Sequence, residues 1–371
     1  MRIAFDHQIF GWQEYGGISR YAYELASELS TSCKQDVAIL SPLYVNKYLD
    51  HVPENLKLHG MQVPSFKYSG RVYRAINSVL IGSAIKRFDP DVVHETYFSR
   101  KGVAPRRAKV ILTVYDMIHE RFPEYFSSAS PTRQEKSLAV KRADHIICIS
   151  EHTRRDLIEI LGVSPNKTSV VHLGFSLAIK PIPKIAGEVL SRPFLLYVGN
   201  RTGHKNFAGL LRAYANSTRL MDEFDLVCFG GGSITAKESD LINELGVPES
   251  RIRQISGDDG LLGFYYRAAK VFVYPSLYEG FGIPPLEAMN FGCPVICSNT
   301  SSIPEVVGDA AYQFDPVDYE SIRKAIENVV WDKSLIKNLI DKGRRRVSCF
   351  SWERCAIETL DVYRKVCLLK S

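Results

Sequence analysis

The sequence lacks several features that would assign it to a non-globular class. Its 371 residues contain no uncharged apolar run of about 18 residues, the length that a membrane-spanning helix needs. The first ten residues, MRIAFDHQIF, carry charges at Arg2 and Asp6 and do not show the basic-then-apolar pattern of a signal segment. There is no low-complexity tract and no short repeat. We therefore expect a cytoplasmic globular protein.

Cysteine patterns typical of disulfide frameworks and zinc sites are also lacking. The eight cysteines are scattered and include no CxxC pair. Cys293 and Cys297 alone approach the spacing of metal ligands, but they lie in the apolar, strand-like run FGCPVICS. We expect reduced thiols in a core, with no metal and no cofactor.

Two further classes lose their support because their motifs are missing. The stretch FGGG at 229–232 does not fit the GxGxxG pattern of a nicotinamide-binding protein. The net charge is +6 and the isoelectric point about 8.8, but no nucleic-acid-binding motif accompanies this charge. We expect no nucleic-acid partner.

The pattern that is present predicts two α/β domains. A strand candidate at the start is followed by a glycine turn and a helical pattern, and further apolar strands alternate with helices as in a doubly wound parallel sheet. The alternation restarts at FLLYVGN, after the proline-containing segment 178–193. We predict two Rossmann-like domains at 1–185 and 186–350, and a C-terminal helix at 351–371 that packs back toward the first domain.

Ligands of such sheets bind at the carboxyl ends of the strands, so the loops there are the first candidates for a site. Gly16-Gly17 would let backbone amides approach an anion at a helix start, although a plain tight turn explains the pair equally well. Arg201 and Lys205 follow the strand FLLYV and suit a pyrophosphate, with a solvated basic turn as the alternative.

The stretch SLYEGFGIPPLEAM places two carboxylates, Glu279 and Glu287, around glycines and a double proline. Since Gly280, Gly282 and the prolines exclude a helix through its first half, we expect Glu279 on a loop and Glu287 in the first turn of a helix. The amides of residues 281–283 (Phe281, Gly282 and Ile283) would then point with the helix dipole at a phosphate. A sugar nucleotide offers both hydroxyls and phosphate to such a site.

These segments resemble the retaining glycosyltransferases of the GT-B fold, family 4, also called group 1 glycosyltransferases. The resemblance rests on YGGISRY, DVVHE, ADHIICISEHTRRDL, VGNRTGHKN, FSWERCAIETLDVYRK and above all the long block that begins PSLYEGFGIPPLEAM, which is similar to the E-x7-E signature of the family. It implies two Rossmann-like doubly wound domains that face a central cleft.

The resemblance also implies roles for individual residues. Glu287 would hold the ribose, Glu279 would lie near hydroxyls of the donor sugar, and Arg201 and Lys205 would stabilise the departing diphosphate. Gly16-Gly17 would close over the phosphates or the acceptor. Transfer would retain the anomeric configuration without a metal, and we set aside a glycosidase-like acid and base pair because the burden of catalysis is electrostatic.

One position departs from the family pattern. Many relatives carry His before Asp at a strand end, whereas this sequence reads LTVYDMIHE with Tyr115-Asp116. Asp116, Tyr115 and His119 are the candidates for the place of that histidine. His7 and His94, also at strand ends, would either line the acceptor site or be structural.

The function implied is transfer of a hexose, with mannose from GDP-mannose as the first candidate because of similarity to O-antigen mannosyltransferases. The acceptor would be a surface polysaccharide or a lipid-linked oligosaccharide. A UDP- or dTDP-sugar transferase of the same fold, and a catalytically silent sugar-nucleotide-binding protein, are the alternatives.

Residues 56–109 carry eleven Lys or Arg and three acidic residues, a local charge of +8. Within them, a helical pattern has basic ends and an apolar stripe through Val72, Ile76, Val79, Leu80 and Phe88. Either this helix makes a peripheral contact with anionic lipid at the inner face of the cytoplasmic membrane, or it is an ordinary helix that covers the sheet.

Overall fold

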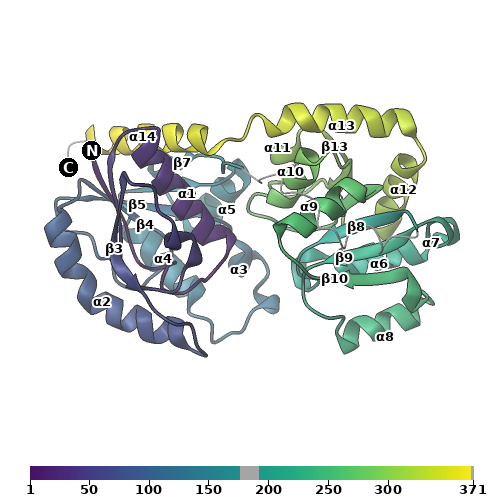
Figure 1. Ribbon diagram of the computed structural model, residues 1–371, viewed down its shortest axis with the longest axis horizontal. Helices are drawn as coiled ribbons and strands as arrows, with labels where there is room; N and C mark the ends of the chain where they lie inside the picture. The colour runs from purple at the N-terminus through teal and green to yellow at the C-terminus, as the bar shows by residue number, and fades with distance from the viewer. Residues whose placement is uncertain (176–191, 369–371) are drawn as a thin grey trace. The chain divides into compact units, whose positions relative to one another are not determined.

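The computed structural model describes residues 1–175 and 192–368, and it divides into two compact units. The N-terminal unit comprises Met1–Gly174 together with Phe350–Ser371, and the C-terminal unit comprises Phe175–Cys349. The boundary expected between 185 and 186 lies outside the described residues. The C-terminal helix belongs to the first of the two units (Figure 1).

In the N-terminal unit the described residues form a sheet of seven strands in the order β3-β2-β1-β4-β5-β6-β7. Each neighbouring pair is parallel. The strands are β1 Arg2–Phe5, β2 Asp36–Tyr44, β3 Leu56–Gln62, β4 Val92–Glu95, β5 Lys109–Val114, β6 His145–Cys148 and β7 Thr168–Val170. Ile3 of β1 pairs with Val37 and with Val92, so β1 is an inner strand, and its apolar residues are buried because helices cover both faces.

The helices of this unit connect the strands, and the last one returns to the unit from the end of the chain. They are α1 Gly17–Thr31, α2 Ser69–Phe88, α3 Ile118–Arg121, α4 Thr132–Arg142, α5 Glu151–Leu161 and α14 Trp352–Leu368, with 3-10 turns at Lys47–Asp50, Pro123–Tyr125 and Pro165–Lys167. Helix α14 packs against α1, where the rings of Tyr21 and Trp352 lie 6.2 Å apart.

The C-terminal unit contains a second parallel sheet, whose described residues form six strands in the order β10-β9-β8-β11-β12-β13. The strands are β8 Phe194–Val198, β9 Asp225–Phe229, β10 Ile252–Ile255, β11 Val271–Tyr274, β12 Val295–Ser298 and β13 Ala311–Phe314. The helices are α6 Phe207–Ala215, α7 Thr218–Glu223, α8 Ala236–Glu244, α9 Asp259–Ala268, α10 Ile283–Asn290, α11 Ile303–Val307, α12 Tyr319–Val330 and α13 Lys333–Val347, with 3-10 turns at Gly203–Lys205 and Glu249–Arg251.

Both sheets follow the same order over their first six positions, and the first strand of each unit is the third strand of its sheet. The order of strands reverses between β1 and β4 in the N-terminal unit and between β8 and β11 in the C-terminal unit. Such a reversal separates the loops that follow the two central strands, and ligands of open α/β sheets bind in the resulting crevice. The prediction of two Rossmann-like doubly wound domains is confirmed.

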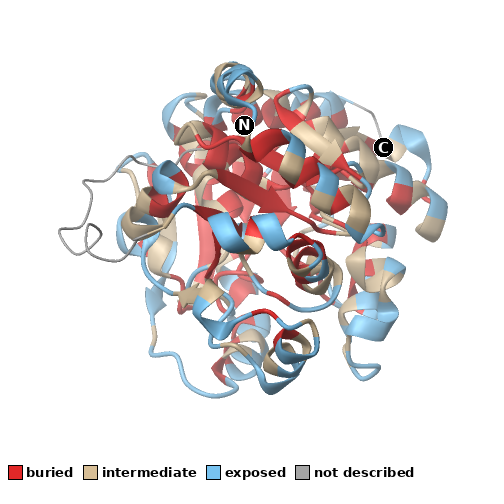
Figure 2. Cartoon of the chain, turned by 90° about the vertical axis from the view of Figure 1, so that its right-hand side faces the viewer, coloured by how far each residue is buried: buried red, intermediate tan, exposed pale blue. Residues whose placement is uncertain are grey.

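Burial follows this layered plan, because strands of a parallel sheet are covered on both faces. Figure 2 shows the strands in red between helices whose outer faces are pale blue. The edge strand β3 is the exception: Lys57, Gly60, Met61 and Gln62 are exposed along it. The sequence patterns did not predict β3, β7 or β13, all of which lie at or near a sheet edge.

Candidate active site

An ion pair joins the two loops at the switch point of the C-terminal sheet. Lys205 ends the loop that follows β8, and Glu279 lies on the loop that follows β11. The Lys205 ammonium donates to both carboxylate oxygens of Glu279, at 2.7 and 3.0 Å. The Lys205 side chain is 24% exposed and that of Glu279 12%, so the pair is largely removed from water.

Backbone and amide contacts hold these two loops together. The Leu277 amide donates to the His204 carbonyl at 2.7 Å. The Asn206 side chain donates to the carbonyls of Pro275 at 3.1 Å and Pro316 at 2.8 Å. Asn206 adopts a left-handed conformation, with φ of 55°, that turns the chain from Lys205 into α6. Lys205 is therefore placed by a rigid turn.

The electrostatics of the pair keep Glu279 ionised. Its burial opposes ionisation, but the ammonium of Lys205 outweighs that effect, and the hydroxyls of Ser276 and Tyr274 also favour the charged form. The pKa of Glu279 is consequently lowered from its ordinary value. The site presents a fixed carboxylate and a fixed ammonium near neutral pH.

A run of hydroxyl residues after β12 fixes the shape of the Glu279 loop. The Glu279 amide donates to the Ser301 hydroxyl at 3.0 Å, and the Ser302 hydroxyl contacts the carbonyls of Glu279 and Phe281 at 2.8 and 2.9 Å. The Thr300 hydroxyl donates to the Leu277 carbonyl at 3.2 Å. Sequence reasoning gave these residues no role, although a hydroxyl-rich run directly after a strand was a usable signal.

Helix α10 carries the second carboxylate, Glu287. Tyr266 donates its hydroxyl to the Glu287 Oε2 atom at 3.1 Å. The prediction that Glu287 lies in the first turn of the helix is wrong. The helix already begins at Ile283, directly after Gly282, whose φ of 111° makes the turn, and the two prolines occupy the next two positions. Glu287 therefore lies in the second turn.

Arg201 also lies at the carboxyl-terminal end of the strands of this sheet, but its guanidinium contacts protein groups. Its Nε donates to Glu238 at 2.8 Å, Nη1 to the Gly230 carbonyl at 3.0 Å, and Nη2 to the carbonyls of Gly232 and Ser233 at 2.9 and 2.8 Å. The side chain is 1% exposed. Arg201 thus joins the loop after β8 to the glycine loop after β9.

The glycine loop is shaped for this contact. Gly230, Gly231 and Gly232 all have φ between 74 and 81°, a conformation that residues with a Cβ rarely adopt. A Cβ on Gly231 would also lie 2.7 Å from the Gly199 carbonyl oxygen and 2.9 Å from Nη1 of Arg201. The run that failed as a dinucleotide motif therefore serves to receive the Arg201 guanidinium.

In the N-terminal unit, Gly16 and Gly17 lie at the start of α1. Gly16 is extended, and a Cβ there would come within 2.4 Å of the Gln13 side-chain oxygen. Gln13 accepts the Ser19 amide at 3.3 Å, so it caps the helix in place of a residue of the helix itself. Gly17 has open space around its Cα.

The three candidates for the place of the family histidine differ in their surroundings. Tyr115 is buried and donates its hydroxyl to the Thr96 carbonyl at 3.0 Å. Asp116 has a side chain that is 34% exposed and accepts the Ile118 amide at 3.0 Å. His119 stacks on Phe126 with 3.9 Å between the ring centroids. Asp116 and His119 remain the accessible candidates, whereas Tyr115 is part of the core.

The two strand-end histidines also differ. The His94 ring contacts the hydroxyls of Thr113, at 2.8 Å, and Tyr363, so it is structural. His7 is 1% exposed, and neither of its ring nitrogens has a hydrogen-bond partner among the described residues. Burial, assisted by the charge of Arg74, lowers the pKa of His7 to about 4, so the ring is neutral at pH 7.

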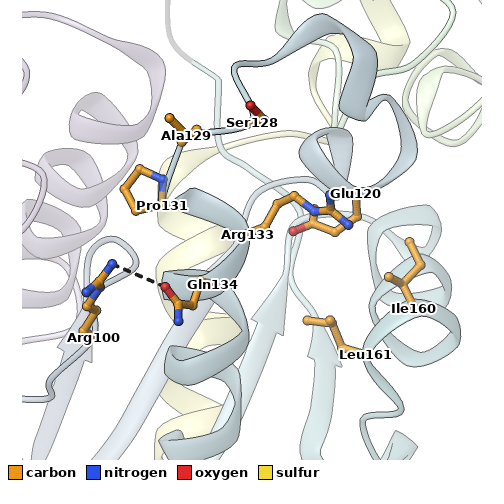
Figure 3. Close-up of a pocket in the computed structure, with 10 residues that line it drawn as sticks. Arg100, Glu120, Ser128, Ala129, Pro131, Arg133, Gln134, Ile160 and Leu161 are labelled. Atoms are coloured by element: carbon orange, nitrogen blue, oxygen red, sulfur yellow. Dashed lines mark hydrogen bonds between the residues drawn. The ribbon is translucent and has the colours of Figure 1, made fainter.

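A pocket of about 650 Å³ lies beside α4 in this unit. Figure 3 shows Arg100 at one side, joined to Gln134 of α4 by a hydrogen bond of 3.3 Å, and Ile160 and Leu161 at the other. A second pocket of about 450 Å³ shares Ser130 and Pro131 with it. Within residues 1–175 and 192–368 there is no group of three His, Cys, Asp or Glu side chains that could hold a metal ion, and no helix long and apolar enough to cross a bilayer.

Two parallel-sheet α/β units of this order are the architecture of the GT-B fold. Two family models match adjacent parts of the chain: Glycosyltransferase Family 4 matches residues 15–178, and Glycosyl transferases group 1 matches residues 179–346. The chain belongs to this glycosyltransferase family.

Individual relatives agree with this assignment. The O-antigen chain mannosyltransferase B of Escherichia coli is 29% identical over 376 residues, which span 94% of this chain and 96% of that protein. The alpha-maltose-1-phosphate synthase of Mycolicibacterium smegmatis is 25% identical, over 99% and 100% of the two chains.

Two solved structures are similar in fold. Sucrose-phosphate synthase from Thermosynechococcus elongatus has a TM-score of 0.73 at 19% identity and covers 99% of each chain. Anabaena HepE in complex with UDP and glucose also has a TM-score of 0.73, at 17% identity, with 98% and 99% of the two chains covered.

Proposed function

We propose that this glycosyltransferase moves a hexose from a nucleotide sugar onto a growing surface polysaccharide or a lipid-linked oligosaccharide, with retention of the anomeric configuration. The observation that carries the proposal is the Lys205–Glu279 pair at the switch point of the C-terminal sheet. Glu287 lies on α10, the helix that directly follows the Glu279 loop. The donor that we put first is GDP-mannose, because the E. coli relative is named as a mannosyltransferase.

The chemistry follows from the charges. When the bond between the anomeric carbon and the phosphate oxygen breaks, negative charge develops on the diphosphate, and the Lys205 ammonium would stabilise it. Glu279 would accept hydrogen bonds from hydroxyls of the donor sugar while it holds Lys205 in place. Glu287 would accept hydrogen bonds from the ribose hydroxyls. The backbone at Phe281, Gly282 and Ile283 would face the phosphates. The proposed reaction uses no metal and no cofactor.

Three further residues keep supporting roles in the proposal. Arg201 would act on the diphosphate mainly by ordering the loop from which Lys205 projects, since its own donors contact Glu238 and backbone carbonyls. Gly16-Gly17 and Asp116 of the N-terminal unit would serve the donor phosphates, the donor sugar or the acceptor.

The second candidate is a UDP- or dTDP-sugar transferase. The structure of Anabaena HepE in complex with UDP-glucose favours keeping this candidate, because that protein shares the fold. A catalytically silent sugar-nucleotide binder is less well supported, because Lys205, Glu279 and Glu287 are all present at one sheet edge.

A screen of donors tests the proposal. Purified protein would be incubated with GDP-mannose, UDP-glucose, UDP-N-acetylglucosamine and dTDP-rhamnose, with thermal shift and slow hydrolysis of the donor as the two measurements. We expect one donor to raise the melting temperature and to be hydrolysed. Stabilisation without hydrolysis would favour the silent binder, and no stabilisation by any donor would contradict the site.

The protein would work at the inner face of the cytoplasmic membrane, held there by α2. One face of α2 covers the sheet through Ile81, Ile85 and Phe88, so Phe88 does not belong to the exposed stripe predicted from the sequence. The other face exposes apolar side chains, namely Val72, Ile76, Val79 and Leu80. The helix contains no acidic residue, and Lys86 and Arg87 are exposed at its end, a pattern suited to anionic lipid.

A further inference from the structure

The N-terminal sheet has its own switch point, and an aromatic pocket lies there. Trp12 belongs to the segment after β1, and Tyr97 follows β4. Their rings lie 5.3 Å apart in a tilted arrangement. The pocket has a volume of about 450 Å³, within the usual size of small-molecule sites. It is lined by residues of both loops, of α2 and of α4: Trp12, Gly70, Arg71, Arg74, Tyr97 and Glu135 are among them.

Trp12 is held in place, yet about half of it is open. A Cβ on Gly70 of α2 would lie only 2.6 Å from Cδ1 of the indole, so the absence of a side chain there makes room for Trp12. The Arg74 guanidinium lies 5.9 Å from the ring centroid. The residue is nevertheless 48% exposed, which is unusual for a tryptophan packed on three neighbours. Such a ring is a suitable platform for the apolar face of a sugar.

Two polar groups of the pocket are available to a ligand. Tyr97 is 9% exposed and lines the pocket, and no hydrogen bond of its hydroxyl enters its electrostatics. A tyrosine presents an apolar ring with a polar tip, so this hydroxyl is suited to a hydroxyl of a ligand. Arg71 has no ion pair with any described residue, and its guanidinium lies 5.8 Å from the centroid of the Tyr68 ring. Arg74, by contrast, is paired with Glu135 at 3.1 Å.

We propose that this pocket binds the acceptor as a sugar carrying an anionic group, with the pyranose ring against Trp12, a sugar hydroxyl on Tyr97 and a phosphate on Arg71. The proposal rests on the proposed function, since it names the substrate class of the acceptor. The phosphate belongs either to a soluble sugar phosphate or to a glycolipid, and the shared chemistry is a hexose linked to phosphate.

The test measures equilibrium binding by intrinsic tryptophan fluorescence. The probes are a panel of hexose 1-phosphates (mannose, glucose, galactose and N-acetylglucosamine), with methyl mannoside and inorganic phosphate as partial ligands. We expect one hexose phosphate to bind at least about tenfold more tightly than either partial ligand, because ring and phosphate contacts combine. Trp12→Phe removes the fluorescent reporter, so its binding is measured by isothermal titration calorimetry, and we expect hexose phosphate binding about fivefold weaker or more. Arg71→Gln should weaken binding of the hexose phosphate and leave binding of methyl mannoside unchanged.

A matched pair of glycine variants on α2 separates the pocket from the stability of the helix. Gly70→Ala places a methyl group against Trp12, whereas the methyl group of Gly82→Ala lies in open space. Both changes favour the helix. We expect Gly70→Ala to weaken hexose phosphate binding about fivefold or more, as displacement of an aromatic contact would. Gly82→Ala should bind like the wild type.

The outcomes separate this inference from the proposed function. If no hexose phosphate binds, or if Trp12→Phe and Gly70→Ala bind it normally, the acceptor pocket is disproved, whether or not a nucleotide sugar is hydrolysed. If the wild-type protein hydrolyses no donor but binds the hexose phosphate through Trp12, the pocket stands and the transferase proposal fails. Vesicles that carry a polyprenyl phosphohexose distinguish the sources: tighter binding to them than to the soluble sugar phosphate indicates a glycolipid acceptor.

Discussion

The two switch points have the same topology and opposite chemistry. In the C-terminal sheet, the loops after the two central strands meet through the Lys205–Glu279 ion pair. In the N-terminal sheet, the corresponding loops meet through the Trp12 and Tyr97 rings. Strand order places the two sets of candidate loops at corresponding positions, whereas the side chains at the loop ends give each set its own chemistry. A charged site suits a diphosphate, and an aromatic site suits a sugar ring.

The buried ionisable side chains at the two switch points also differ in charge. At the N-terminal one, burial raises the pKa of Asp6 to about 6 against the hydrogen bonds from Thr96 and Gln8, and burial lowers the pKa of His7 to about 4. At the C-terminal one, Lys205 keeps Glu279 ionised despite burial. The Asp6 and His7 side chains of the N-terminal switch point are therefore largely uncharged between about pH 4 and pH 6, whereas Lys205 and Glu279 form an ion pair.

The largest effect that would sharpen this comparison is loss of the Lys205 ammonium at the switch point of the C-terminal sheet. Lys205→Ala should reduce transfer by about two to three orders of magnitude, since a charge that stabilises the leaving group is removed. The measurement is kcat/KM with the donor identified in the screen. Lys237→Ala, which removes an exposed lysine from α8, is the control. A rate within about twofold of wild type for Lys205→Ala would contradict the assignment of the site.

The next effect concerns the hydrogen bond between Arg201 and Glu238, which lies between the loops after β8 and β9. Arg201→Ala and Glu238→Ala should both lower kcat/KM about tenfold and reduce the melting temperature by a few degrees, because each removes one member of a largely buried, charged hydrogen bond. Glu238 also caps α8 by accepting the Thr235 amide, so its loss should be felt in stability as well. If Arg201→Ala reduces the rate far more than Glu238→Ala, the guanidinium acts on the diphosphate directly.

A smaller effect distinguishes the two units by their surfaces. Val79 of α2 and Val317 of the C-terminal unit are 79% and 80% exposed, so they form a matched pair. Val79→Glu should weaken binding to phosphatidylglycerol vesicles about tenfold at low salt, since it puts a like charge and a polar group against the lipid. Val317→Glu should leave co-sedimentation unchanged. Equal behaviour of the two variants, or no vesicle binding by the wild type, would remove the membrane contact.

The sequence predicted the fold well where the strands are buried on both faces. FLLYV and KVILTV are apolar runs with clear loops after them, and they form β8 and β5. The strands β3 and β13 were not predicted because each lies at a sheet edge and carries polar residues. The hydrophobic periodicity and the composition therefore give only a weak strand signal there.

The site was predictable in its residue types and less so in its contacts. Glu279 lies on a loop as expected, but the start of α10 was misplaced because Gly282, and not the prolines, makes the turn. The partnership of Arg201 with Glu238 joins residues 37 positions apart, and no local pattern reports such a contact. Trp12 and Tyr97, from loops 85 positions apart in sequence, meet only because β1 and β4 are neighbours.

The smallest effect tests the neutrality of the N-terminal switch point. Asp6 has a pKa raised from 3.8 to about 6, so the folded state binds more protons than the unfolded state between these values, and stability falls as the pH rises. Asp6→Asn cannot ionise, and between pH 5 and 6 it should gain about 1 kcal/mol of unfolding free energy relative to wild type. Urea unfolding at the two pH values, followed by tryptophan fluorescence, measures this difference. Parallel changes in the two proteins would mean that the Asp6 carboxylate is as ionised as an exposed one, and the contrast between the two switch points would then rest on Trp12 and Tyr97 alone.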